Sequence, residues 1–132
     1  MNTKTPIKEV EEIKPLIEVL EELRNEGIVL LAILFGSFAG GKVHARSDID
    51  LAIYLKELPL EEEIEVIDRI LLSTERDINI LRLDDDEESP FVVQEALKGI
   101  HLVKPDKNVY YHVADMALHE AESIRFRRGI DE

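Results

Sequence analysis

The sequence predicts one mixed α/β (α+β) domain in which a small β-sheet is flanked by helices. Two apolar patterns alternate along the chain. Apolar residues three or four positions apart indicate helices, and short apolar or alternating runs indicate strands. The length of 132 residues suits one domain, and no internal repeat or long linker divides it. We therefore expect residues 1–132 to form a single domain.

The helical pattern occurs in four segments. In the first, residues 7–26, Pro15 either kinks the helix or lies in the first turn of a second piece that begins near Lys14. Gly27 is placed to end this helix. The other segments are residues 60–72, residues 91–98 with Ser89 and Pro90 before them and Gly99 after them, and residues 108–128.

Four segments are expected to be strands. Residues 28–35 form a continuous apolar run, which is typical of a strand buried on both faces. In residues 48–56, Leu51, Ile53 and Leu55 alternate with Ala52 and Tyr54, as expected for a second strand. Residues 77–83 are predicted to form a third strand. Residues 100–103 predict a short fourth strand. The mixture of strands and helices indicates a sheet covered by helices.

Composition excludes several classes of function. A formal net charge of −13 argues against direct binding to nucleic acid, which needs a basic surface. Without cysteine, disulfides and thiolate metal sites are excluded. No apolar run is long enough to cross a bilayer, and the first residues lack the apolar stretch of a signal peptide. We therefore expect a cytoplasmic protein with no membrane contact.

The candidate site lies between residues 33 and 54. Asp48 and Asp50 are two residues apart on a predicted strand, so their side chains point to the same face. Two adjacent carboxylates repel each other unless a cation lies between them, and such hard oxygen ligands suit Mg²⁺ or Mn²⁺. Gly36 and Ser37, at the end of the preceding strand, offer backbone N–H groups and a hydroxyl to a phosphate chain.

Further charged residues complete the candidate site. Lys42 and Arg46 in the loop supply nearby positive charge, although loop solubility would explain them as well. Asp77, at the start of the third strand, is the candidate third acid, either as general base or as a metal ligand. The alternative for Asp77 is a surface acid that pairs with Arg76 or with a lysine.

These residues carry a resemblance to a known family. Gly36-Ser37, ten residues, and then Asp48-Ile49-Asp50 match the G-S-x10-D-x-D signature of the DNA polymerase β-like nucleotidyltransferase superfamily. The whole chain resembles the smallest members, the minimal nucleotidyltransferases (MNT proteins), which implies the nucleotidyltransferase fold. The family carries its third acid on the strand after the intervening helix, which favours Asp77, with Asp84 as the fallback.

The resemblance also implies an activity. Family members transfer AMP from ATP to a hydroxyl with Mg²⁺ (or Mn²⁺) and release pyrophosphate. Many MNT proteins are antitoxins that act as protein adenylyltransferases on a tyrosine of a HEPN-domain toxin. The alternatives are an antitoxin that acts by binding alone and transfer to a small-molecule hydroxyl. One departure is Gly40, where relatives often carry an arginine, so Lys42 or Arg46 would have to contact the phosphates.

The remaining candidates have simpler explanations. His112 and His119 lie on the last predicted helix and are expected at its surface rather than on a metal. His44 lies in the site loop and is not assigned a contact. An apolar stripe on the last helix predicts core packing or, alternatively, a surface for a homo-oligomer or a toxin; its residues are Val109, Val113, Met116 and Ala117.

Overall fold

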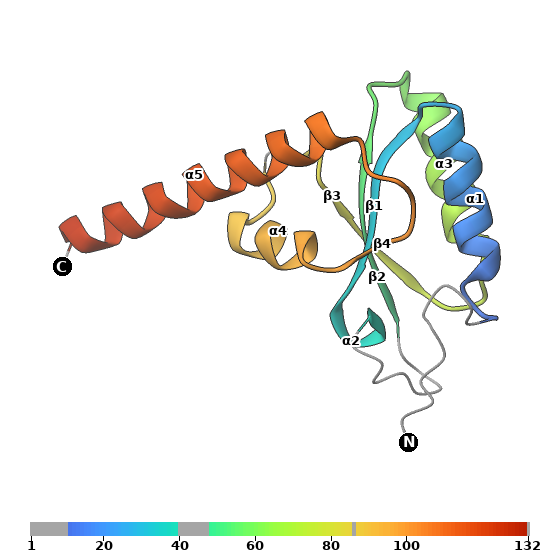
Figure 1. The fold of residues 1–132 in the computed structure, drawn as a ribbon, viewed down its shortest axis with the longest axis horizontal. Helices are drawn as coiled ribbons and strands as arrows, with labels where there is room; N and C mark the ends of the chain where they lie inside the picture. The colour runs from blue at the N-terminus through green and yellow to red at the C-terminus, as the bar shows by residue number, and fades with distance from the viewer. Residues whose placement is uncertain (1–10, 40–47, 86, 132) are drawn as a thin grey trace.

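The chain folds into a four-stranded sheet with helices on both faces. The computed structural model describes residues 11–39, 48–85 and 87–131 (Figure 1). Helices and strands alternate as expected, and most of the predicted ends shift by only a few residues. The elements are α1 (Lys14–Asn25), β1 (Val29–Phe35), α2 (Gly36–Ala39), β2 (Ile49–Leu55), α3 (Leu60–Leu71), β3 (Ile78–Arg82), α4 (Pro90–Leu97), β4 (Ile100–His101) and α5 (Lys107–Asp131).

The sheet has the strand order β3-β2-β1-β4. β1 pairs antiparallel with β2 and with β4, whereas β2 pairs parallel with β3 through the crossover helix α3. In this register Phe35 lies opposite Asp50, and Asp50 lies opposite Asn79. The end of β1, the start of β2 and the start of β3 therefore meet at one edge of the sheet.

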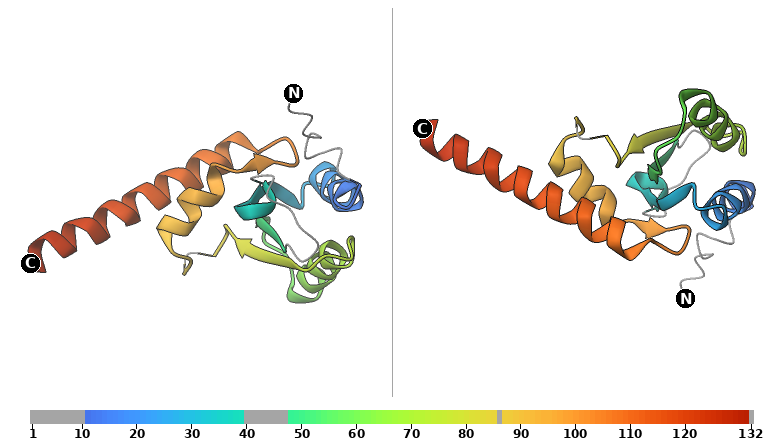
Figure 2. Two further views of the ribbon diagram at one scale, coloured as in Figure 1. Left: turned by 90° about the horizontal axis from the view of Figure 1, so that it is seen from below. Right: turned by 90° about the horizontal axis from the view of Figure 1, so that it is seen from above.

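Two apolar cores cover the two faces of the sheet. One core joins the sheet to α1 and α3, and the other joins it to α4 and α5. Figure 2 shows these two pairs of helices on opposite sides of the sheet. Along β2, Ile49, Leu51 and Ile53 face the first core, whereas Ala52 and Tyr54 face the second. The predicted alternation of this strand is thus confirmed.

β1 is buried on both faces, as its continuous apolar sequence predicts. Leu31 and Ile33 point into the α4–α5 side, and Ala32 and Leu34 point into the α1–α3 side. The register with β2 shifts between Val29 and Leu31, which places Val29 on the α1–α3 side against the regular alternation. This irregularity lies at the end of β1 that is distant from the candidate site.

The first helix is shorter at its start than predicted. α1 begins at Lys14 with Pro15 in its first turn, because proline suits a position where no helical N–H bond is needed. Residues 11–13 form a turn, and residues 7–10 lie outside the described residues. At the other end Gly27 has φ 75°, and Ile28 N–H donates to Leu23 C=O (2.9 Å). This is the Schellman termination that glycine favours.

Gly99 has a different role from the predicted one. α4 begins after Ser89, as expected, but it ends at Leu97, and Gly99 does not have the positive φ of a helix-ending glycine. A Cβ on Gly99 would lie 2.2 Å from the backbone oxygen of Leu34. A glycine is therefore needed here because the chain passes close to β1.

α5 starts against the sheet and then leaves the body of the domain (Figures 1 and 2). Val113 and Ala117 of the predicted stripe are buried, whereas Met116 is 46% exposed. Core packing thus explains only part of that stripe. Among the described residues, none of the helices is both long and apolar enough to span a bilayer.

Candidate functional site

The site is organised around the turn after β1. Gly36 has φ 74°, which side chains other than glycine rarely adopt. A Cβ placed on Gly36 would lie 2.2 Å from Oδ2 of Asp50. Backbone conformation and close packing therefore both require glycine, and the turn lies directly against the carboxylate of Asp50. Ser37 follows in the short helix α2, and its side chain lies outside what the structure describes.

The two acids of the signature occupy the positions that the alternation predicts. Asp48 directly precedes β2 and is exposed, whereas Asp50 is half-buried beside the turn. Ile49 and Leu51 between and after them are fully buried on the opposite face. This packing holds the backbone of both acids in place, so the carboxylates share one face at the edge of the sheet.

A third residue of this site is Asn79, which the sequence interpretation missed. Its side-chain nitrogen donates hydrogen bonds to Asp50 Oδ1 (3.2 Å) and to Asp48 Oδ2 (3.4 Å). A signal for it exists in the sequence, since Asn79 and Asp77 are two apart on one strand and must share a face. Selecting only acidic residues as candidates left the amide out.

Asp77 lies next to the site rather than between the two acids. It directly precedes β3, and its backbone oxygen accepts a hydrogen bond from Ile49 N–H (2.9 Å). Its exposed side chain lines the same cleft as Asp48, a hollow of about 870 Å³. Within the described ranges, however, no three carboxylate or imidazole groups converge where they could hold one metal ion. The assignment of Asp77 as third acid stays a prediction.

Arg76 provides positive charge in the same cleft. Its guanidinium pairs with Glu12, in the turn before α1. The hydrogen bond from Arg76 lowers the pKa of the Glu12 carboxyl, and the same bond raises the pKa of Arg76. The two predicted loop cations, Lys42 and Arg46, lie outside the described residues together with Gly40 and His44.

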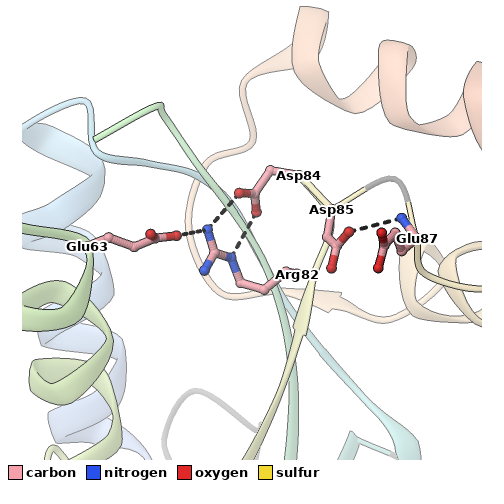
Figure 3. Close-up of polar contacts among 5 residues, drawn as sticks. All are labelled: Glu63, Arg82, Asp84, Asp85 and Glu87. Carbon is pink, nitrogen blue, oxygen red and sulfur yellow. Dashed lines mark hydrogen bonds and ion pairs between the residues drawn. The ribbon is translucent and has the colours of Figure 1, made fainter. Parts of the chain in front are cut away.

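Asp84, the fallback third acid, is far from the site. It lies beyond the other end of β3, roughly 15 Å along the strand from Asn79. There Arg82 forms ion pairs with Asp84 and with Glu63 of α3 (2.6 Å each), as Figure 3 shows. The hydrogen bonds that Arg82 donates, first to Asp84 and then to Glu63, raise the pKa of Arg82. These contacts make Asp84 part of an ion-pair cluster at the end of β3 opposite to Asn79.

Asp85 and the two histidines of α5 have contacts away from the site. Asp85 accepts a hydrogen bond from the backbone N–H of Glu87 (2.9 Å), a contact between neighbouring residues after β3 (Figure 3). His112 and His119 are both exposed on α5, and Nδ1 of His119 lies 2.8 Å from the backbone oxygen of Asp115. The two histidines thus lie at the helix surface, as expected.

The geometry fits a divalent metal. Oxygens of Asp48 and Asp50 converge on one hydrogen-bond donor, the amide of Asn79, so a cation in that place would meet two hard oxygen ligands. The adjacent Gly36 turn leaves room beside Asp50 that a Cβ would fill. Phosphate oxygens suit the remaining positions of Mg²⁺ or Mn²⁺, which makes the edge a candidate site for a metal-bound phosphate chain.

Comparisons with solved structures support this fold over nearly the whole chain. A chain of a toxin–antitoxin complex with AMP-PNP is 20% identical with a TM-score of 0.67, over 92% of this chain and 94% of that chain. A second similar chain belongs to a complex between a tri-AMPylated HEPN toxin of Shewanella oneidensis and an MNT antitoxin. It is 16% identical with a TM-score of 0.61, over 90% of this chain and 93% of that chain. A chain of an MntA–HepT toxin–antitoxin complex is 17% identical with a TM-score of 0.60, over 89% and 92%.

The sequence itself matches a family model. No curated protein matches the chain. The family described as "Polymerase beta, Nucleotidyltransferase" matches residues 16–108, a range that includes the turn at Gly36, both signature acids and Asn79. The chain therefore belongs to the polymerase β nucleotidyltransferase family.

Proposed function

We propose that the protein is a metal-dependent nucleotidyltransferase that transfers AMP from ATP to a hydroxyl group, and that the acceptor is a tyrosine of a partner HEPN toxin. The convergence of Asp48 and Asp50 beside the Gly36 turn is the observation behind this proposal. Membership of the family supports nucleotidyl transfer as the reaction type. An ATP analogue in one structurally similar complex supports ATP as the nucleotide.

Each residue of the site has a defined task in this reaction. Asp48 and Asp50 hold Mg²⁺ or Mn²⁺, which when bound stabilises negative charge on the phosphate oxygens. The Gly36 turn brings backbone close to the triphosphate, with Ser37, Lys42 and Arg46 as further contacts. The acceptor oxygen attacks the α-phosphorus, the bond from that phosphorus to the bridging oxygen breaks, and pyrophosphate leaves. Asp77 takes the hydroxyl proton as general base.

A protein acceptor is supported by the surroundings of the site. The cleft next to Asp48 is open and wide, at about 870 Å³, which leaves room for a side chain presented by another protein. One structurally similar complex pairs an MNT antitoxin with a HEPN toxin, and the toxin in it is tri-AMPylated. We extend this role to the present chain, which would act as an antitoxin.

Mass spectrometry of the partner tests the proposal directly. The purified protein is incubated with ATP, Mg²⁺ and the HEPN protein encoded beside it, and the expected result is covalent AMP on a tyrosine of that protein. EDTA in place of Mg²⁺ should abolish the mass gain. An unmodified partner, despite measured binding of metal and of the partner, would contradict the proposal.

A binding antitoxin without catalysis is the second candidate. The observation in its favour is the amide of Asn79 beside the two acids, since an amide cannot accept the acceptor's proton. The Asp48→Ala, Asp50→Ala double variant separates the two. If the double variant still neutralises the toxin fully, binding alone is sufficient and catalysis is not the mechanism.

A further inference from the structure

Asn79 occupies the central position between the two signature acids. It lies opposite Asp50 in the parallel pairing of β2 with β3, and its amide nitrogen reaches both carboxylates at 3.2 and 3.4 Å. One donor group thus contacts an oxygen of each acid. A cation shared by the two acids would lie close to this position, so the amide group would have to draw back and turn for its oxygen to face such an ion.

The hydrogen bonds of the Asn79 amide nitrogen can be broken and replaced by a contact of the amide oxygen. Both distances are longer than the roughly 2.9 Å typical of N–H···O bonds, and the Asn79 side chain is exposed. The amide carries donors on nitrogen and an acceptor on oxygen, so a half-turn about its terminal bond replaces one by the other. A cation repels the N–H groups and attracts the carbonyl oxygen Oδ1.

The amide also sets the charge of the site. An aspartate at this position would add a third negative charge close to Asp48 and Asp50, and no carboxylate of the described residues takes that place. An asparagine oxygen is a hard but neutral ligand for divalent metals. Because ligand charge is a main determinant of metal affinity, a neutral third ligand gives weaker binding than three carboxylates would.

We propose that Asn79 is a neutral third member of the metal site: its amide nitrogen bridges Asp48 and Asp50 in the metal-free protein, and its Oδ1 turns toward a cation that binds between them. This inference rests on the proposed function, because it takes the two acids as metal ligands. It assigns the third place around the metal to Asn79, which leaves Asp77 free to act as the proton acceptor.

Metal titration of four proteins tests the inference. Mn²⁺ binding is measured by calorimetry for the wild type, Asn79→Ala, Asn79→Asp and Asn108→Asp. Asn108→Asp is a matched control, since it adds the same charge at an exposed position in the first turn of α5. We expect about 10-fold weaker binding for Asn79→Ala and at least about 10-fold tighter binding for Asn79→Asp, with the control within about 2-fold of wild type.

Two results would overturn the inference. One is Asn79→Ala binding Mn²⁺ as tightly as the wild type, which would make the amide a bystander. The other is Asn79→Asp binding no more tightly than the control. Thermal unfolding in EDTA establishes that each variant is folded. If Asn79→Asp folds only with metal, Asn79→Ala and the spectroscopic test below decide.

Nuclear magnetic resonance observes the amide itself. The side-chain NH₂ signals of Asn79 are assigned by their absence in Asn79→Ala and followed during addition of Mg²⁺. We expect them to shift as the bonds to the acids are released, and to stay in place in the Asp48→Asn, Asp50→Asn double variant. Unmoved Asn79 signals in a wild-type protein that binds Mg²⁺ would refute the inference. Neither measurement requires AMP transfer, so a failure of the proposed reaction is seen separately.

Discussion

The two ends of the β2–β3 pair differ in the group that contacts their acids, which is a cation at one end and a neutral amide at the other. At one end Arg82 lies opposite Ile53 and donates to both Glu63 and Asp84, so two carboxylates share one guanidinium. At the other end two carboxylates, of Asp48 and Asp50, share a neutral amide at 3.2 and 3.4 Å. In terms of these contacts among the described residues, one pair of acids is compensated by a shared cation and the other pair, which shares only a neutral amide, is uncompensated.

This difference separates a structural role from a binding role. At the Arg82 end the cation is part of the chain, and the ion pairs tie α3 to β3 and to the following loop. At the Asn79 end the group that contacts both acids is a neutral amide, so their negative charge is available to attract a metal ion. The metal-dependent nucleotidyl transfer that we propose needs the second arrangement.

Removing the uncompensated acids gives the largest expected effect. The Asp48→Asn, Asp50→Asn double variant should lose AMP transfer by about 1,000-fold or more, since charge stabilisation at the phosphates disappears. Its thermal midpoint in EDTA should equal or exceed that of the wild type, because the repulsion between the two carboxylates is removed. A double variant with the same charge change on exposed helix positions, Asp68→Asn with Asp115→Asn, is the control and should keep the activity.

Closing the space beside Asp50 should have the next largest effect. Gly36→Ala combines a strained φ with a clash against the Asp50 carboxylate, and we expect a loss of about 2–3 kcal/mol in the free energy of unfolding. Gly27→Ala has the same positive φ but an open environment, so it should lose only about 1 kcal/mol. Urea denaturation compares the two. Equal losses in the free energy of unfolding would show that the clash with Asp50 does not add to the destabilisation by Gly36→Ala.

Removing the cation from the compensated pair of acids should reduce stability less than Gly36→Ala does. Arg82→Met leaves Glu63 and Asp84 without their shared cation, and we expect a loss of about 1–2 kcal/mol, measured by urea denaturation. Arg69→Met removes an ion pair with Glu22 whose side chains are 42% and 62% exposed, so about 0.5 kcal/mol or less is expected. A loss for Arg82→Met no larger than for Arg69→Met would remove the contrast between the two ends.

The smallest effect concerns the pH dependence of the Glu12–Arg76 pair. Because Arg76 lowers the pKa of Glu12 in the folded protein, the pair stabilises the fold above pH 4.5, the ordinary pKa of a glutamate side chain. That contribution is lost as the pH falls through the lowered value. Stability measured between pH 7 and pH 3 should therefore decline slightly less in Glu12→Gln than in the wild type. Curves of stability against pH that run parallel in the two proteins would contradict this prediction.

Local patterns predicted most of the fold. Alternation in residues 48–56 correctly placed Asp50 on one face and Leu51 on the other, and the apolar run of residues 28–35 predicted a strand buried on both sides. The start of the first helix and the role of Gly99 were predicted less well. A helical apolar period continues through Pro15 in sequence, and the approach of Gly99 to β1 is a tertiary contact with no local signal.

Local patterns in the sequence also predicted part of the candidate site. The contact between Gly36 and Asp50 follows from an antiparallel pairing of neighbouring strands, so the motif spacing already implies it. The position of Asn79 opposite Asp50 depends on the parallel register of β3 with β2, a pairing across a crossover that the local pattern does not determine. Asp77 on the same strand was predicted because it is an acid, whereas the amide of Asn79 was not considered as a candidate.

The strand order gives the two sides of the site unequal freedom to move. β2, which carries Asp50, is hydrogen-bonded on both edges, whereas β3, which carries Asn79, has a neighbour only on one edge within the four-stranded sheet. Displacing Asp50 requires opening two ladders, while β3 can separate locally at a lower free-energy cost. In the proposed reaction, ligands of different size would therefore be accommodated from the Asn79 side, and the carboxylates would be the fixed reference against which a phosphate chain is positioned.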